Sequence, residues 1–490
     1  MKTKLHKIGI FLLILFSATS FSQEETKGAH QSQKEEFGKI ENTASQNRGN
    51  YDAIIPLQNR ESNTLSKKVF GFLPYWEQSS GAHNNIQYNL MTHIACFDFM
   101  VQSDASVDTP VGWPWTTEIN AAHAQGVKVI MTVVNFGGSD GADAVAWELF
   151  TNTSKKNTFF ANVKSIIQAA SLDGVNIDFE GMTTGHRGAE LNTFMAQLTT
   201  YIHTELGSEY EVSFDGPAVN WGGWIMDDLV AAVDYLIVMA YDYEGSGSSK
   251  TGAVAPLTHH TSWKRFVTRT IVGVGGTSTY QSVTESTPEK LILAVPYYGQ
   301  HWKTATSSPE STITSYEGST RFRNTVTEVN TSGYESFWNS NFESPWYRWN
   351  DGTNWHQVWA DDVLSISKKY DLAIDSNLGG IGIWALNYDG TRPELWDLID
   401  TKFNDTASID DFLSESLKVY PNPTNQFISF SNNIELTSAE IFNLVGQKVL
   451  KLNPTQNSFD LSSLSNGIYI LKVEDTKGNQ GAIKIIKAEL

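Results

Sequence analysis

The stretch LDGVNIDFEG, residues 172–181, alternates apolar and polar residues. This period of two predicts a β-strand whose apolar residues face one side while Asn176, Asp178 and Glu180 face the other. Carboxylates on a buried face are costly unless a neighbour or a ligand pairs with them. A polar edge strand is the ordinary explanation, but apolar runs upstream and downstream favour a strand inside the fold. The two acids are therefore candidates for chemistry.

Further short apolar runs, separated by helical stretches, surround this strand. With the opening stretch as the fourth, the other predicted strands are residues 69–75, 91–99, 127–134, 210–214, 235–240, 291–296 and 381–385. Apolar strands that alternate with helices, such as the helical pattern in residues 155–171, indicate a parallel sheet covered on both sides. Eight strands within residues 67–403 predict an α/β fold, a (β/α)8 TIM barrel. An open doubly wound sheet fits less well, because the sequence lacks a glycine-rich phosphate loop.

The ends of these strands carry the polar side chains. TIM barrels place their catalytic groups at the carboxyl ends of strands, where Glu180 stands. Asp178 lies two residues earlier on the same face, so we expect its carboxyl to hydrogen-bond that of Glu180. Two neighbouring carboxyls share protons unequally, so one stays protonated near neutral pH and can act as a general acid.

Two other strand ends add a hydroxyl, an acceptor and a flat ring. Tyr241 and Asp242 follow the sixth strand, and Trp384 lies in the eighth. A local hydrogen bond explains a Tyr-Asp pair, and a core position explains a strand tryptophan. Their shared location at strand ends favours a site. The long tryptophan-rich connection between the last two strands, residues 297–378, is expected to carry function or a small subdomain.

Several motifs resemble those of one known family. DGVNIDFE, residues 173–180, is similar to the D-G-x-D-x-D-x-E signature of glycoside hydrolase family 18, the chitinases, endo-β-N-acetylglucosaminidases and relatives. The other matching motifs, in order, are residues 69–76, 239–242, 295–299 and 379–384. The resemblance covers residues 67–403. It implies a hydrolase of β-1,4-linked N-acetylglucosamine polymers such as chitin, without a metal or other cofactor.

The resemblance also implies substrate-assisted hydrolysis with retention. Glu180 would protonate the glycosidic oxygen, and the substrate's own N-acetyl oxygen would attack the anomeric carbon to give an oxazolinium ion. Asp178 would orient the acetamido N–H, Tyr241 would hydrogen-bond the acetamido oxygen, and Glu180 would later activate water. The residues implied to contact the sugar are Asp242, Trp384, Asn176, Met239, Tyr75 and Tyr297.

Asn176 departs from the family pattern, which most often has Asp at this position. A carboxylate there would share a proton with Asp178 or repel it, whereas an amide only hydrogen-bonds, so we expect activity shifted in pH. Asn at this position also resembles family branches that cut peptidoglycan. Peptidoglycan and the chitobiose core of N-glycans therefore stay open as substrates. A catalytically silent lectin on the same barrel is the alternative from another class; such lectins usually lose the acid.

Composition limits the partners. The net charge of −19 and the pI near 5.0 argue against nucleic acid and anionic membranes, because both need a basic footprint. A single cysteine, Cys96, excludes an internal disulfide and a cysteine-rich zinc site, and its apolar surroundings predict a buried position. We expect a monomer that acts on a polysaccharide.

The N-terminal residues have the patterns of a signal peptide and of a polar leader segment. Residues 1–22 have a basic start, an apolar stretch and a small-residue site, as in a Sec signal peptide, and the apolar run is too short for a stable membrane anchor. Residues 23–66 are polar and are expected to form a flexible leader, because they cannot bury enough apolar area to offset the entropy of ordering.

The C-terminal residues predict a second folded unit. After a linker at 404–417, residues 418–490 show short alternating runs divided by turn signals, which predicts a small β-sandwich. This unit resembles a type IX secretion sorting domain of Bacteroidetes, through the motifs VYPNP (419–423), NLVGQKV (443–449), LSNGIY (464–469) and KIIK (484–487). The resemblance implies a secreted or cell-surface protein, exported through a Sec signal and then the type IX machinery. A generic carbohydrate-binding sandwich is the alternative.

Overall fold

The computed structural model describes two units. The described residues are 28–39, 53–59, 65–136, 142–259, 265–274, 279–404, 418–430, 436–443, 447–453, 456, 458–476 and 480–488. Contacts divide the chain into one unit made of residues 1–61 with 67–402 and another made of residues 62–66 with 403–490. The predicted signal peptide, residues 1–22, and the predicted linker lie outside the described residues, apart from Asn404. No helix in the described part of the chain is long and apolar enough to cross a membrane.

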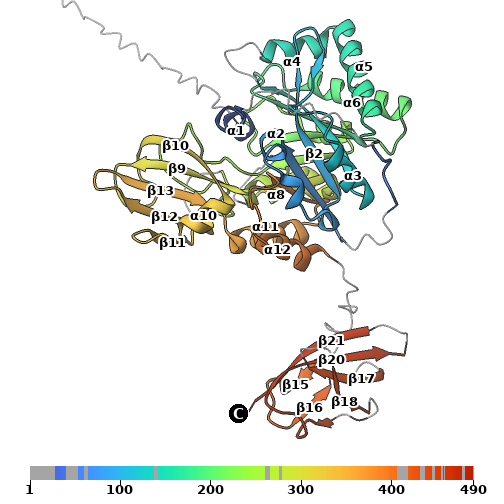
Figure 1. The fold of residues 1–490 in the computed structure, drawn as a ribbon, viewed down its shortest axis with the longest axis vertical. Coiled ribbons are helices and arrows are strands. Elements are labelled where there is room, and N and C mark those ends of the chain that lie inside the picture. The colour runs from blue at the N-terminus through green and yellow to red at the C-terminus, as the bar shows by residue number, and fades with distance from the viewer. Residues whose placement is uncertain are drawn as a thin grey trace, which may run out of the picture. The chain divides into compact units, whose positions relative to one another are not determined.

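The first unit is a closed barrel of eight parallel strands (Figure 1). They are β1 (Lys68–Pro74), β2 (His93–Val101), β4 (Lys128–Phe136), β5 (Gly174–Glu180), β6 (Glu211–Pro217), β7 (Tyr235–Met239), β8 (Leu291–Pro296) and β14 (Gly380–Trp384). The barrel closes because β1 pairs with both β2 and β14. All eight predicted strands are confirmed. A short strand, β3 (Val107–Asp108), adds an antiparallel edge to β2.

Helices alternate with the strands of the barrel. They are α2 (Tyr75–Gln78), α3 (Thr116–Ala124), α4 (Ala142–Thr151), α5 (Thr153–Ala169), α6 (Ala189–Glu205), α7 (Met226–Ala232), α8 (Val267–Val272), α9 (Gln281–Ser286), α11 (Val363–Asp375) and α12 (Glu394–Phe403), with short 3-10 turns at Ala82–Asn84, Tyr88–Leu90 and Pro288–Lys290. The predicted helix at residues 155–171 is α5. Asn152 caps it by accepting from the backbone N–H groups of Ser154 and Lys155.

The tryptophan-rich connection forms a small subdomain. Its antiparallel sheet, in the order β10-β9-β13-β12-β11, contains β9 (Tyr298–Thr304), β10 (Ile313–Arg321), β11 (Glu335–Asn339), β12 (Ser344–Asn350) and β13 (Trp355–Ala360), and α10 (Phe322–Glu328) follows β10. Trp302, Trp346 and Trp359 form its core together with Phe342 and Ala253. These three tryptophans therefore serve packing.

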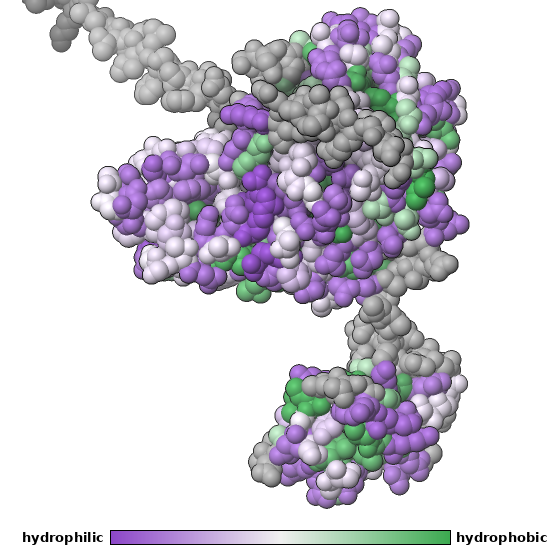
Figure 2. All heavy atoms as spheres, viewed as in Figure 1, coloured by the Kyte–Doolittle hydropathy of each residue, from purple (hydrophilic) through white to green (hydrophobic). Residues whose placement is uncertain are grey.

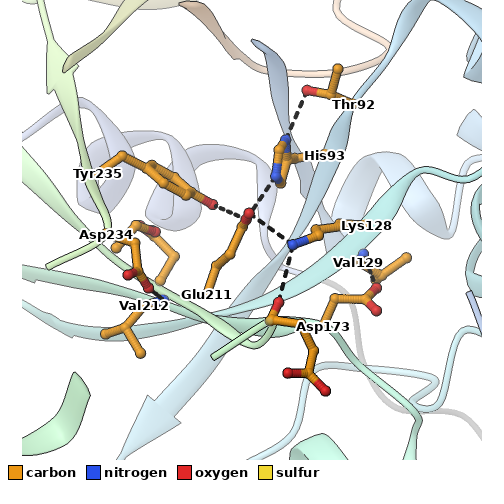
Figure 3. A network of polar contacts seen from close by, with 12 residues as sticks. Thr92, His93, Lys128, Val129, Asp173, Glu211, Val212, Asp234 and Tyr235 are labelled. Atoms are coloured by element: carbon orange, nitrogen blue, oxygen red, sulfur yellow. Dashed lines mark hydrogen bonds and ion pairs between the residues drawn. The ribbon is translucent and has the colours of Figure 1, made fainter. Parts of the chain in front are cut away.

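A polar network joins the amino ends of four barrel strands (Figure 3). Glu211, the first residue of β6, accepts a hydrogen bond from Tyr235 (3.0 Å), forms an ion pair with Lys128 (2.8 Å) and lies 2.7 Å from Nε2 of His93. Thr92 lies 2.7 Å from the other ring nitrogen of His93. The network lies at the end of the barrel where the strands begin, opposite the end where the catalytic groups are expected. Residues at this end of a TIM barrel contribute to stability.

The second unit is an all-β sandwich. One sheet contains β15 (Val419–Tyr420), β16 (Phe427–Phe430) and β19 (Ser458–Asp460), and the other contains β17 (Leu436–Asn443), β18 (Lys448–Leu452), β20 (Gly467–Asp475) and β21 (Gln480–Lys487). Both sheets contribute to one hydrophobic core, for example Phe459 from the first and Leu471 from the second. The expected small β-sandwich is therefore present.

Part of the expected flexible leader is folded, and that expectation was wrong for these residues. Residues 29–37 form α1 (Ala29–Phe37), which belongs to the barrel unit. Ile55 also contacts α3: its backbone N–H donates to Asn120 (2.9 Å), and its carbonyl lies 2.6 Å from Nδ1 of His123. Figure 2 shows that the outward surface at the position of α1 in Figure 1 is hydrophilic. Contacts with the barrel, and not an apolar core of its own, therefore order this segment.

Candidate active site

The carboxyl end of β5 brings the two predicted acids into the mouth of the barrel. Asp178 is fully buried, and the side chain of Glu180 is 12% exposed. The expected hydrogen bond between their carboxyls is not among the bonds of the described residues, and an imidazole stands in its place. Nδ1 of His30 lies 2.7 Å from Oδ2 of Asp178 and 3.3 Å from Oε1 of Glu180.

Both acids hold their protons more tightly than free carboxyls. Burial and, second, the charge of Asp178 raise the pKa of Glu180 to about 8. Burial and the charge of Asp98 raise the pKa of Asp178 well above its usual range. Glu180 is therefore protonated at neutral pH, which is the state a general acid needs.

Asn176 is tied to a buried acid that the sequence analysis missed. Its amide donates to Oδ2 of Asp215 (2.8 Å), and its carbonyl accepts from the hydroxyl of Ser213 (2.8 Å). Burial and then the charge of Asp178 raise the pKa of Asp215 well above its usual range. Asn176 is fully buried, and its amide is hydrogen-bonded to protein groups. Asp215 is the acid that it contacts directly, and the expected sugar contact of Asn176 stays a prediction.

Tyr241 and Asp242 follow β7 into the same mouth. The hydroxyl of Tyr241 lies 2.7 Å from Nε2 of His30. Asp242 accepts hydrogen bonds from Gln300 (3.0 Å) and Tyr298 (3.4 Å), both on β9, so the inserted sheet builds one wall of the site. Burial raises the pKa of Asp242 to about 7.

Met239 and Trp384 stand at the ends of two strands of the barrel, β7 and β14, which are separated by β8. Met239 is the half-buried last residue of β7. Trp384 ends β14 and is fully buried, with the ring of Phe97 edge-on at 4.9 Å between centroids. Its indole N–H donates to Gln33 of α1 (2.9 Å). The indole therefore lies in the mouth of the barrel, and its role as the floor of a sugar subsite stays a prediction.

The two remaining predicted residues differ in their placement. Tyr75 lies directly after β1, and its hydroxyl donates to the carbonyl of Gly38 (2.7 Å), at the end of α1. Tyr297 is turned away from the mouth, because its hydroxyl contacts that of Tyr370 on α11 (3.0 Å). Tyr298, the first residue of β9, reaches Asp242, whereas Tyr297 lies at the bend before β9. The contact with Tyr370 argues against a sugar contact through the Tyr297 hydroxyl, and that contact stays a prediction.

The donor atoms of His30, Asp178 and Glu180 all lie within 4.8 Å of one another, a spacing that could hold a metal ion. The hydrogen bond between His30 and Asp178 accounts for this closeness. The three side chains therefore meet where α1 docks on the barrel.

The fold and the acid cluster define the class: a (β/α)8 barrel with a glycosidase-type acid at the end of β5. The chain belongs to the family described as Glycosyl hydrolases family 18, whose model matches residues 68–389. Residues 418–488 match the model of the Secretion system C-terminal sorting domain. Both resemblances of the sequence are therefore confirmed, and the sorting domain supports secretion or export to the cell surface.

Known proteins resemble the barrel at low identity. A putative sporulation-specific glycosylase of Bacillus subtilis is 24% identical over 282 residues, which cover 55% of this chain and 60% of that protein. Di-N-acetylchitobiase of Rattus norvegicus is 25% identical over 285 residues, covering 54% of this chain and 72% of that protein. A family GH18 chitinase from Cycas revoluta, in complex with allosamidin, aligns with a TM-score of 0.59 at 20% identity, over 68% of this chain and 99% of that one.

Proposed function

We propose that the chain hydrolyses β-1,4-linked N-acetylglucosamine polymers, such as chitin, with retention through an oxazolinium intermediate. The observation that carries the proposal is the position of Glu180: it ends β5, keeps its proton at neutral pH and lies beside Asp178 and Tyr241. A glycosidase that uses the substrate's own acetamide needs one acid at this position and no distant second carboxylate.

The reaction follows from these groups. The Glu180 carboxyl gives its proton to the glycosidic oxygen as the bond from that oxygen to the anomeric carbon breaks. The acetamido oxygen then bonds to the anomeric carbon, and the positive charge spreads over the oxazolinium ring. Asp178 accepts the acetamido N–H, and Tyr241 donates to the acetamido oxygen. The Glu180 carboxylate next takes a proton from water, whose oxygen replaces the acetamido oxygen at the anomeric carbon.

The contacts of His30 support these two roles. One ring nitrogen contacts Asp178, and the other contacts Tyr241. A neutral imidazole with its proton on Nδ1 satisfies both, because it donates to a carboxyl oxygen of Asp178 and accepts from the phenol. An acetamido group presents the same pair, an N–H donor beside an oxygen acceptor. Asp178 and Tyr241 are therefore spaced to grip a small flat group of this kind.

Two other polymers fit the same chemistry. Asn176 and the similarity to a sporulation-specific glycosylase favour peptidoglycan as an alternative, and the similarity to a di-N-acetylchitobiase favours the chitobiose core of N-glycans. A silent lectin is disfavoured because the acid Glu180 is present with Asp178 and Tyr241. We further propose that the protein is a monomer that leaves through a Sec signal and then the type IX machinery.

The test of the activity is product analysis on colloidal chitin, peptidoglycan and a glycoprotein in parallel. The protein used is one in which α1 has been released from the mouth of the barrel, so that the substrate can enter. Glu180→Gln should abolish the release of reducing ends, because an amide cannot give up the proton, while binding of chitin oligomers persists. The matched control is Glu205→Gln, since Glu205 is exposed near the end of α6. Turnover retained in Glu180→Gln contradicts the assignment, and the polymer that yields products identifies the substrate.

A further inference from the structure

The helix α1 lies in the mouth of the barrel, over the proposed catalytic groups. His30 is fully buried there, although residues 23–66 have the composition of a polar leader. Its imidazole contacts Asp178 and Tyr241 and stacks on Trp384, with ring centroids 3.7 Å apart. Burial lowers the pKa of His30 to about 4 against the opposing effect of Glu180, so the ring is neutral at pH 7.

The rest of the helix continues along the same cleft. The side-chain oxygen of Gln33 accepts from the indole of Trp384 (2.9 Å) and from the hydroxyl of Tyr388 (2.8 Å). Lys34 forms an ion pair with Asp98, which follows the centre of β2. Positions 30, 33 and 34 share one face of a helix, so a single face of α1 makes these contacts.

The last turn of the helix meets the inserted sheet. Glu36 accepts from the backbone N–H of Ser319 on β10 at 3.1 Å. The guanidinium of Arg321, the last residue of β10, lies 3.9 Å from the ring centroid of Phe37. The segment therefore spans the site from the acids at one end to the wall formed by the insertion at the other.

Glycines flank the helix where the backbone approaches the site most closely. A Cβ atom on Gly28 would lie 1.6 Å from Oε2 of Glu180, and one on Gly38 would lie 2.3 Å from the hydroxyl oxygen of Tyr75. No side chain fits at either position without a shift of the site residue or of the segment. The fit of the segment therefore depends on its own sequence at both ends.

The docked segment leaves some polar atoms without hydrogen bonds. Within the described part of the chain, Gln33 Nε2, Asp178 Oδ1 and Glu180 Oε1 are buried and form none. Each such atom costs stability, because water would otherwise solvate it. A segment that served only to complete the fold would be expected to bury apolar area, whereas this one buries polar atoms against the reacting groups.

We propose that residues 28–38 are an autoinhibitory segment, which fills the subsite for the acetamido sugar and keeps the full chain latent until the segment leaves. The inference rests on the proposed function for the identity of that subsite. The same two atoms cannot hold His30 and an acetamido group at once, so sugar and segment compete. A helix of nine residues is marginal in water by itself, so the cleft and the covalent tether hold it in place.

The first test cuts the tether in the otherwise intact chain. A recognition sequence for a site-specific protease is inserted after Lys39, which is exposed and follows the segment. Allosamidin serves as the probe, and its binding is measured by calorimetry before and after cutting. Cutting turns the segment into a separate molecule that dilution removes. If the docked state is at least nine-tenths populated, affinity should rise at least about ten-fold.

The second test weakens docking without cutting. The variant His30→Ala with Gln33→Ala loses four hydrogen bonds to the cleft and should also bind the probe at least about ten-fold more tightly. The matched control is Gln31→Ala with Ser32→Ala, on the same helix, where Gln31 pairs with Glu35 one turn away. The control should bind as the intact chain does. A general loss of folding would weaken binding and cannot imitate this gain.

The outcomes separate the two proposals. Affinity that is unchanged both by the cut and by the double substitution overturns the autoinhibition. A gain in affinity with turnover of one of the three polymers supports both proposals. A gain in affinity without turnover of chitin, peptidoglycan or glycoprotein supports the blocking of the cleft by the segment and overturns the proposed function. Full turnover by the uncut chain, equal to that of the cut chain, overturns the autoinhibition and leaves the proposed function standing.

Discussion

The imidazole of His30 stacks on the indole of Trp384, with ring centroids 3.7 Å apart and an angle of 29° between the rings. A pyranose is expected on this indole face, with its acetamide between Asp178 and Tyr241. A histidine from the leader thus uses both the stacking surface and the polar pair of the proposed subsite. Catalysis should therefore be measured on the protein from which residues 28–38 have been displaced.

The first prediction concerns the pH dependence of catalysis. Glu180 must carry a proton to act as the acid, and its pKa is raised to about 8 when the cleft is filled. Bound substrate excludes water as α1 does, so kcat should be high below pH 8 and fall as pH rises through it. The measurement is kcat on a chitin oligomer between pH 3 and 10. A kcat that falls already near pH 4 to 5 would show an unshifted carboxyl.

The second prediction concerns Asn176→Asp. The new carboxylate would add negative charge beside Asp215 and near Asp178, and like charges raise the pKa of a carboxyl. The alkaline limb of the profile should therefore move up by about one pH unit. The control is Asn157→Asp, the same change at an exposed position on α5. An unchanged profile for Asn176→Asp would show that this position does not influence the acids.

The third prediction compares two tyrosines that lie close to strand ends. Tyr241→Phe removes the proposed donor to the acetamido oxygen and should lower kcat roughly 100-fold, as the loss of such a donor does in other sites. Tyr297→Phe removes a hydroxyl that faces Tyr370 on α11, so kcat should stay within about two-fold of the parent. Equal losses in both variants would return Tyr297 to the substrate site.

The fourth prediction concerns the stability of the barrel. Burial would raise the pKa of Glu211, but hydrogen bonds and charges from His93 and Lys128 outweigh it and hold the pKa well below its usual range. Glu211→Gln should lower the free energy of unfolding by roughly 3 kcal/mol at pH 7, because it breaks a largely buried ionic network.

The sign of the pH effect follows from the lowered pKa. The stabilisation from Glu211 is fully present above the pKa of an unfolded glutamate, about 4.3, and is lost as pH falls toward the folded value. The difference between parent and variant should therefore shrink in acid. Urea unfolding followed by tryptophan fluorescence is suitable, since all 15 tryptophans lie in the barrel unit and none lies in the second unit. Glu209→Gln is the control, because only its backbone carbonyl joins the network; an equal loss there would contradict the prediction.

The sequence was sufficient to predict the barrel, because each strand is a short apolar run buried on both faces. It also placed Glu180, Asp178, Tyr241 and Trp384, since the carboxyl ends of parallel strands meet at one mouth. Asp215 was missed because the predicted fifth strand ended one residue earlier, although its alternation with Ser213 continued the polar face of the strand.

The helix α1 was not predicted from the sequence, for a different reason. Its contacts come from His30, Gln33, Lys34 and Phe37, which recur at helical spacing, but three of the four are polar. A search for apolar periodicity cannot find a helix whose ordered face is polar and whose partner lies far along the chain. The polar composition of residues 23–66 predicted too little apolar burial to order this segment. That prediction did not take into account the buried polar cleft into which α1 docks.

The segment that docks over Glu180 is itself a peptide ligand of the cleft, made only of natural amino acids. A helix that carries histidine and glutamine one turn apart satisfies Asp178, Tyr241 and Trp384 without any carbohydrate. The cleft therefore recognises a donor and an acceptor on a flat ring above an indole, which many short peptides can present. Display libraries built on an eleven-residue template, from Gly28 to Gly38, offer a genetically encoded route to selective inhibitors of such clefts.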